Sequence, residues 1–185
     1  MPKPNIAVLG YALFVTINAT SLWGGVFPFF PMEFHTPEVT ILFFLSQALA
    51  YCATFFLTML VAYRRPEFVH KTLVLIAMAL AIAGAISLIA AMYLKWLTIP
   101  LVVCGGVCLG MGCGGFAMAW QRYFSAMAST SGIFYLLAGT MLGAPVFFAL
   151  YLVPSAVTVY LSPVILIPVC LSLIHISEPT RPERI

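Results

Sequence analysis

Six apolar stretches, separated only by short polar breaks, take up almost the whole chain of 185 residues. A helix of ~20 residues crosses the hydrocarbon core of a bilayer, which is about 30 Å thick, and the stretches have about that length. The expected spans are residues 6–27, 39–62, 72–92, 99–120, 132–151 and 156–170. We therefore predict an all-α, polytopic membrane protein in which residues 1–170 form one six-helix transmembrane domain.

The composition and the run lengths exclude the main alternatives. Hydrophobic residues make up 63% of the chain and charged residues 7%, a balance that excludes a soluble fold of this size. A transmembrane β-barrel needs alternating segments of about ten residues, and these runs do not alternate. The first run is too long for a cleaved signal peptide, and Phe27–Pro31 is not a small-residue cleavage site. Helices, whose backbone groups pair internally, remain as the spanning structure.

Basic residues fall unevenly on the two sides of these spans. Cytoplasmic loops retain Lys and Arg, so the richer side faces the cytoplasm. The other side has Lys95, with Glu33 and Glu38 nearby. The richer side carries Lys3 and four residues expected to act as cytoplasmic basic anchors: Arg64, Arg65, Lys71 and Arg122. The bias places both the N-terminus and the C-terminal end of the domain in the cytoplasm.

The composition changes abruptly after Cys170. Residues 171–181 read Leu-Ser-Leu-Ile-His-Ile-Ser-Glu-Pro-Thr-Arg, which resembles an in-frame translation of a common transposase-based sequencing adapter. We interpret residues 171–185 as a non-native, disordered tail and exclude them from the fold, with a native amphipathic or disordered tail as the alternative. On this interpretation the natural protein continues past Cys170.

Glycine is concentrated in the fourth expected span. Gly106, Gly110 and Gly114 follow one another at every fourth residue and therefore lie on one face of a helix. Gly139 and Gly143 repeat the spacing in the fifth span. Such small-residue stripes let a second helix approach closely, so we expect these five residues to serve helix packing. The alternative is that these glycines form a sliding or rocking contact between helices of a bundle that changes conformation.

Uncharged polar side chains are the only candidates for a binding site within the spans. None of the six span interiors contains Asp, Glu, Lys, Arg or His, the residues that mark ion and proton pathways. Asn18, Gln47 and Thr140 lie at membrane depth. Such groups most often join helices by hydrogen bonds, and the alternative interpretation is that these three line a ligand cavity.

The sequence predicts no catalytic, cofactor or metal site. No nucleophile stands beside a base, so an enzyme is not expected. The glycine-rich span lacks the Lys-Ser/Thr ending of a phosphate loop. Cys104, Cys108 and Cys113 have no CxxC spacing and are interpreted as small buried residues. Glu33, His35 and Glu38 are close enough in sequence for a divalent ion, but a solvated acidic loop is the preferred interpretation.

Six spans with both ends inside resemble one half of a major facilitator superfamily transporter. Residues 139–145, Gly-Thr-Met-Leu-Gly-Ala-Pro, resemble the family's Gly-xxx-Gly-Pro pattern with Ala144 inserted. The basic loop after the second span lies where the family has its basic signature between helices. The Gly and Asp of that signature are absent from this loop. The fourth span also lacks the membrane arginine of many drug antiporters. These departures argue against active transport.

A closer resemblance is to the N-terminal membrane region of actinobacterial LuxR-type transcription regulators, which carry a transporter-like bundle before a helix-turn-helix domain. It rests on the glycine-rich fourth span running into Trp120–Phe124 and on residues 139–145 followed by Tyr151–Pro154. It covers about residues 5–170. The resemblance implies a membrane sensor whose cytoplasmic output domain follows this sequence.

The expected function is therefore the membrane-embedded input domain of a LuxR-type regulator in a bacterial cytoplasmic membrane. The alternative is the first half of a secondary transporter, and a free-standing six-span scaffold or enzyme subunit is a third reading. The expected partners are the lipid bilayer, an unknown small-molecule ligand, further transmembrane helices and a cytoplasmic output domain of the same protein. No nucleic-acid contact is expected in the fragment itself, since its net charge of +3 reflects the cytoplasmic basic residues.

The interpretation of the tail predicts the genomic sequence. We expect the source locus to depart from Leu171–Arg181 immediately after the Cys170 codon and to continue as an open reading frame. Sequencing the locus from genomic DNA measures this directly. A genomic frame that encodes residues 171–185 as printed would make the adapter interpretation wrong.

Overall fold

The computed structural model describes residues 4–21, 31–64, 71–125, 127, 129–150, 152–153, 165–166 and 168–169. The elements in order are α1 (Pro4–Ser21), the 3-10 helix η2 (Met32–Phe34), α2 (Pro37–Arg64), α3 (Lys71–Tyr93), the 3-10 helix η3 (Lys95–Leu97), α4 (Thr98–Ser125) and α5 (Ser129–Leu150). Within these residues there is no β-strand. The predicted all-α fold is therefore confirmed.

Four of these helices are long and apolar enough to cross a membrane: α2, α3, α4 and α5. At 1.5 Å per residue, the 28 residues of α2 extend about 42 Å and the 22 residues of α5 about 33 Å, both more than a hydrocarbon core. The apolar part of α1, Ile6–Thr20, is shorter. The sixth expected span, residues 156–170, lies almost wholly outside the described residues. A membrane protein is indicated, while the count of six passes and the orientation stay predictions.

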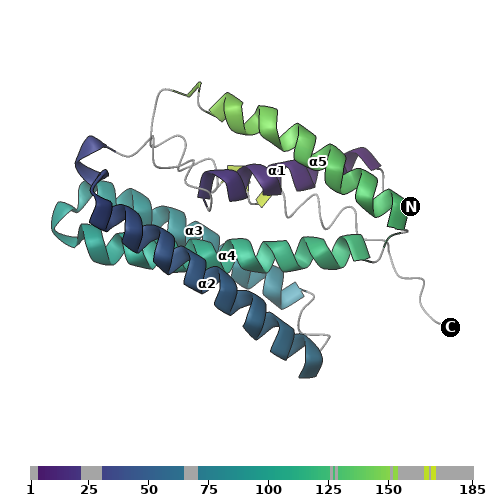
Figure 1. The fold of residues 1–185 in the computed structure, drawn as a ribbon, viewed down its shortest axis with the longest axis horizontal. Coiled ribbons are helices and arrows are strands. Elements are labelled where there is room, and N and C mark those ends of the chain that lie inside the picture. The colour runs from purple at the N-terminus through teal and green to yellow at the C-terminus, as the bar shows by residue number, and fades with distance from the viewer. Residues whose placement is uncertain are drawn as a thin grey trace.

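Consecutive helices run in alternating directions along a common axis (Figure 1). The chain runs in one direction in α1, in the opposite direction in α2, and continues to alternate through α5. Such alternation is what short connections between successive membrane spans require. Figure 1 also separates the helices into two groups, with α2, α3 and α4 in one and α1 and α5 in the other.

The first group is built around α4. Buried positions make up 61% of the apolar window of α4, against 28% for those of α2 and α3 and 11% for that of α5. Extensive contacts join α4 to α2 and to α3, whereas α4 touches α1 and α5 at few points. A hydroxyl also crosses the α3–α4 interface, because Ser87 Oγ donates to the Leu101 carbonyl at 2.8 Å. The glycine-rich helix is thus the centre of a three-helix unit.

Glycine produces this packing through two separate stripes on α4. Gly106, Gly110 and Gly114 face α2, where an added Cβ would meet residues of the Phe43–Thr54 segment. Gly105, Gly112 and Gly115 face α3, where a Cβ would meet Leu88, Ala81 and Ala77. The first stripe was expected from its spacing. The second stripe was not assigned from the sequence, and it lets the same helix pack closely on both sides.

The second group is the α1–α5 pair. A Cβ on Gly139 would lie 2.7 Å from Tyr11 Cδ1, and one on Gly143 would lie 3.1 Å from the Ala12 carbonyl oxygen. This close approach brings a hydroxyl of one helix to the backbone of the other. Thr16 Oγ1 donates to the Gly143 carbonyl at 3.2 Å and to the Ala12 carbonyl of its own helix at 2.9 Å.

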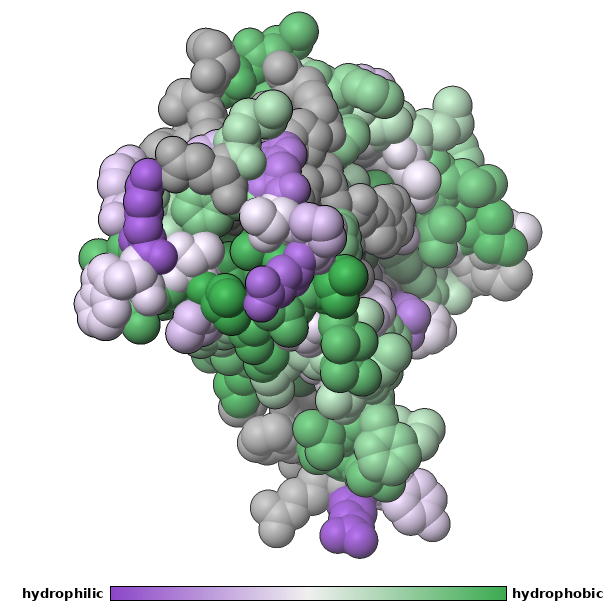
Figure 2. Space-filling view, turned by 60° about the vertical axis from the view of Figure 1, so that its left-hand side comes forward, coloured by the Kyte–Doolittle hydropathy of each residue, from purple (hydrophilic) through white to green (hydrophobic). Residues whose placement is uncertain are grey.

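The surface is apolar along the helices and polar near their ends. In Figure 2, hydrophobic residues cover much of the visible surface, and the most hydrophilic ones form several separate patches. Large exposed side chains on α2 include Leu49, Phe56 and Met59, and those on α5 include Phe134 and Met141. Exposed apolar area of this extent is compatible with lipid tails as the surrounding medium.

The α3 stripe predicts a large effect of one methyl group. A Cβ at position 112 would lie 2.8 Å from the Ala81 backbone nitrogen and 2.9 Å from the Ala77 carbonyl oxygen, atoms that cannot rotate away. We expect Gly112→Ala to lower the free energy of unfolding by about 1–3 kcal/mol despite the better helix propensity of alanine. The measurement is denaturant or thermal unfolding of the protein in detergent.

Gly132→Ala is the matched control, because among the described residues its Cβ would meet one atom, the Phe124 carbonyl oxygen at 3.3 Å. This variant should change the unfolding free energy by less than about 1 kcal/mol. Equal effects of the two substitutions would contradict the proposed role of close α3–α4 contact.

Candidate functional site

Aromatic side chains meet at the junction between the α1–α5 pair and the three-helix unit, which we call the seam. Tyr11 and Phe14 of α1 meet Trp120 of α4 with ring centroids 5.5 and 6.4 Å apart. Tyr11 also packs edge-on against Phe124 at 5.0 Å, and Phe124 stacks on Trp120 at 5.6 Å. Side chains rather than backbones make the contact across the seam, since the backbones of α1 and α4 approach each other at few points.

A cavity of about 410 Å³ lies in the seam. Its described lining comes from four helices: Tyr11, Phe14, Val15 and Asn18 of α1, Tyr51 of α2, Ala117, Trp120, Gln121 and Phe124 of α4, and Leu136 of α5. Gln121 and Leu136 are exposed, which places the opening of the cavity beside them. The volume is within the range of about 300–1,000 Å³ found for small-molecule sites.

Two residues of the cavity lining each have a buried side-chain polar atom without a hydrogen-bond partner. Asn18 is 7% exposed and its Oδ1 is unpaired, and Trp120 is 1% exposed and its Nε1 is unpaired. Each such atom costs about 1–3 kcal/mol, because water no longer solvates it and no protein group replaces the water. One is an acceptor and the other a donor. A bound molecule that meets them after a small side-chain rotation recovers this free energy.

Of the three residues predicted to line a ligand cavity, one lines the seam cavity and the other two lie elsewhere. Asn18 lines the seam cavity. Gln47 is buried on α2, where its backbone carbonyl faces Gly110, and it is not part of the described lining. Thr140 is exposed on α5 and donates to the Leu136 carbonyl at 2.8 Å.

The aromatic lining was missed because each ring, taken alone, is ordinary in a membrane helix. Tyr11, Phe14 and Asn18 are spaced i, i+3, i+7 on α1, and Ala117, Trp120 and Phe124 have the same spacing on α4. Both stripes are detectable in the sequence as single helix faces. The sequence does not show that these faces of α1 and α4 lie opposite one another in the fold. The structure buries Trp120 in the core.

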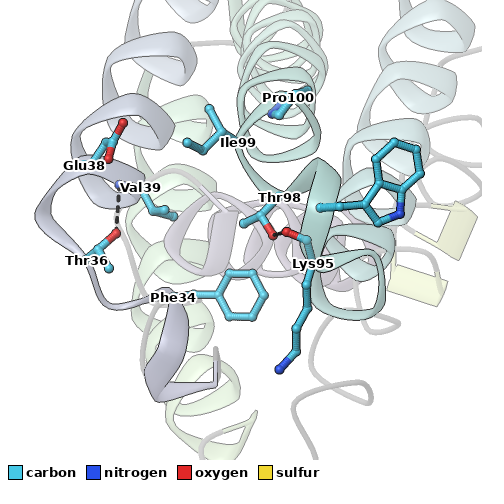
Figure 3. A pocket seen from close by; sticks show the side chains of 9 residues that line it. Phe34, Thr36, Glu38, Val39, Lys95, Thr98, Ile99 and Pro100 are labelled. Carbon is cyan, nitrogen blue, oxygen red and sulfur yellow. Dashed lines mark hydrogen bonds between the residues drawn. The ribbon is translucent and has the colours of Figure 1, made fainter.

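A second hollow, the outer cup, lies where η2, the start of α2 and the start of α4 meet (Figure 3). It has a volume of about 470 Å³ and is lined by Phe34, Thr36, Glu38, Val39, Lys95, Trp96, Thr98, Ile99 and Pro100. Thr36 Oγ1 accepts from the Val39 backbone N–H at 3.3 Å, and Thr98 Oγ1 donates to the Lys95 carbonyl at 2.9 Å.

These bonds begin helices and do not face a ligand. The Glu38 and Lys95 side chains extend in different directions (Figure 3). The outer cup is therefore the weaker of the two sites, because its described polar groups serve the local backbone or project away from the hollow.

The described residues contain no group of three or more His, Cys, Asp or Glu side chains that could hold a metal ion. His35 and Glu38 are exposed, and the side chain of Glu33 lies outside the description. In the described part of the chain the cysteines are free, with Cys113 buried in α4 and Cys104 exposed on it.

Among the basic anchors, Arg64 is exposed at the end of α2 and Arg122 is half-buried in the last turn of α4. Lys71 begins α3, but its side chain is not described, and Arg65 falls outside the described residues.

No protein family, curated protein or solved structure matches the chain. The fold itself defines an all-helical membrane protein, and its seam contains an aromatic-lined cavity. Its function is argued below from that cavity and from the packing around it.

The unpaired Oδ1 of Asn18 is expected to lower the free energy of unfolding of the protein. Asn18→Leu removes the buried Oδ1 without a partner, and the adjacent cavity has room for the larger side chain. We expect the variant to gain about 1–3 kcal/mol in the free energy of unfolding in the absence of ligand. The measurement is unfolding in detergent, compared with Gln47→Leu, which removes a buried amide that is not left without a partner. Gln47→Leu should lose stability, and a loss of stability in Asn18→Leu would show that Oδ1 is satisfied.

Proposed function

We propose that this chain is the membrane-embedded, ligand-binding input domain of a LuxR-type transcription regulator. The observation that carries the proposal is the seam cavity, which holds a buried acceptor and a buried donor without partners and lies between two helix groups. A ligand in that position contacts both groups at once. It therefore favours whichever relative placement of the groups binds it better, and it shifts the equilibrium by that difference in affinity.

The packing supports such a movement. Glycine stripes hold α2 and α3 against α4, and a further stripe holds α5 against α1, so each group is close-packed internally. The seam is different, because side chains and a cavity separate the backbones there. Displacement across the seam disturbs fewer close contacts than displacement within either group. In the proposed mechanism this relative shift is passed to a cytoplasmic DNA-binding domain that follows the bundle.

The pairing of helices favours a transporter-like bundle, which both candidate functions share. Each half of a major facilitator transporter contains two three-helix repeats in inverted orientation. If helices 1, 2 and 3 of the first repeat correspond to helices 4, 5 and 6 of the second, then α1 corresponds to α4 and α2 corresponds to α5. The α1–α5 pair in this bundle therefore corresponds to the α4–α2 pair. These two pairs have extensive contacts, and in both of them glycines of the later helix face the earlier one.

The second candidate function is therefore the N-terminal half of a secondary transporter. In that case substrate would bind near the midplane between this bundle and a second one. The seam cavity lies within one bundle rather than between two, and this position favours sensing, because a transported substrate must have access to both sides of the membrane.

The proposal predicts DNA binding by the full-length protein at its source. Chromatin immunoprecipitation of the tagged protein, expressed from its own locus, should enrich specific promoter regions. Leu136→Trp places a large ring at the mouth of the cavity, and we expect it to change the output of an enriched promoter by about fivefold or more.

Leu137→Trp is the matched control. Its side chain is exposed on the same helix and does not belong to the described lining of the cavity, so promoter output should stay close to that of the wild type. An absence of enriched DNA relative to the untagged strain would overturn the regulator proposal. Enrichment with equal effects of both variants would overturn the role of the seam.

A further inference from the structure

The chemistry of the seam cavity defines a class of ligand, an inference that rests on the proposed ligand-binding function. Its walls are largely aromatic, with Tyr11, Phe14, Tyr51, Trp120 and Phe124 in the lining. Aromatic rings pack most favourably against other rings, stacked with an offset or edge to face. The rings of this cluster already adopt both geometries with one another. A flat aromatic ligand extends this packing, whereas a flexible aliphatic one does not.

Charge on the ligand is disfavoured. None of the described lining residues is Asp, Glu, Lys, Arg or His, so an ionised ligand would find no counter-charge there. Removal of an ion from water without such a partner is costly, and more so at membrane depth. The ligand that fits is neutral at physiological pH.

The two unpaired atoms specify the polar part of the ligand. Asn18 Oδ1 accepts a hydrogen bond and requires an N–H or O–H donor, while Trp120 Nε1–H donates and requires an acceptor. Asn18 follows Phe14 by one helical turn, and the ring of Phe14 lies beside that of Trp120, so the two residues come from neighbouring parts of the lining. A cyclic amide offers an N–H donor and a carbonyl acceptor side by side in one planar ring.

We propose that the seam cavity is a binding site for neutral, planar heteroaromatic lactams, held by Asn18 and Trp120 between the rings of α1 and α4. The simplest bicyclic member of this class, 2-quinolone, serves as the probe. Its N-methyl derivative has nearly the same shape but lacks the N–H donor, which makes it the matched control ligand.

The test is equilibrium dialysis of both ligands against the full-length protein encoded at the source locus, purified in detergent, with protein-free micelles as the blank. We expect saturable binding of one 2-quinolone per chain with a Kd below about 1 mM. N-methyl-2-quinolone should bind about tenfold more weakly, since it leaves Asn18 Oδ1 unpaired.

Protein variants complete a double-mutant cycle between ligand and side chain. In Asn18→Leu the binding of 2-quinolone should weaken about tenfold, and the difference between the two ligands should disappear. Trp120→Phe, which retains a ring but removes Nε1–H, should also weaken 2-quinolone. Thr20→Val is the control, because the Thr20 hydroxyl bonds carbonyls of its own helix and does not line the cavity.

Three results would overturn the assignment: no saturable binding of 2-quinolone up to about 1 mM, equal binding of the two ligands to the wild type, or an unchanged preference in Asn18→Leu. The proposed regulator function is tested separately through DNA enrichment. Promoter enrichment without 2-quinolone binding would therefore exclude this ligand class and leave the regulator proposal standing.

Discussion

The close approach of α4 to two neighbours at once is the constraint on which the rest of the structure depends. Six glycines, on two faces of one helix, remove the side chains that would otherwise separate its backbone from those of α2 and α3. In a bilayer the helices gain little by hiding apolar surface from one another, so such van der Waals contact is the main source of association. The three-helix unit follows from this contact, and it leaves α1 to pair with α5.

The seam is a consequence of the same division. Helices packed through glycine leave no internal space, whereas α1 and α4 meet through large rings that do not fill the volume between them. The cavity therefore forms where glycine packing ends. The buried, unpaired atoms of Asn18 and Trp120 reduce the stability of the protein, a cost that is common at functional sites.

Sequence reasoning found the helices more readily than the site. Apolar length alone predicted five of the helices that the structure describes, because a bilayer makes long apolar runs helical wherever they occur. The spacing of Gly106, Gly110 and Gly114 identified one packing face. The α3 face escaped notice because Gly105, Gly112 and Gly115 are separated by seven and three residues, a spacing that is recognised as a stripe only once its partner is known.

The sequence by itself determined that this is an all-helical membrane protein with a glycine-rich central span, since both properties follow from residue type and local spacing. Tertiary structure alone decided which helices pair. Gln47 and Asn18 are both buried amides in apolar helices, and nothing local distinguishes them. Packing sets Gln47 against the close α2–α4 contact and Asn18 in the wall of a cavity, because one helix meets its neighbour through glycine and the other through aromatic rings.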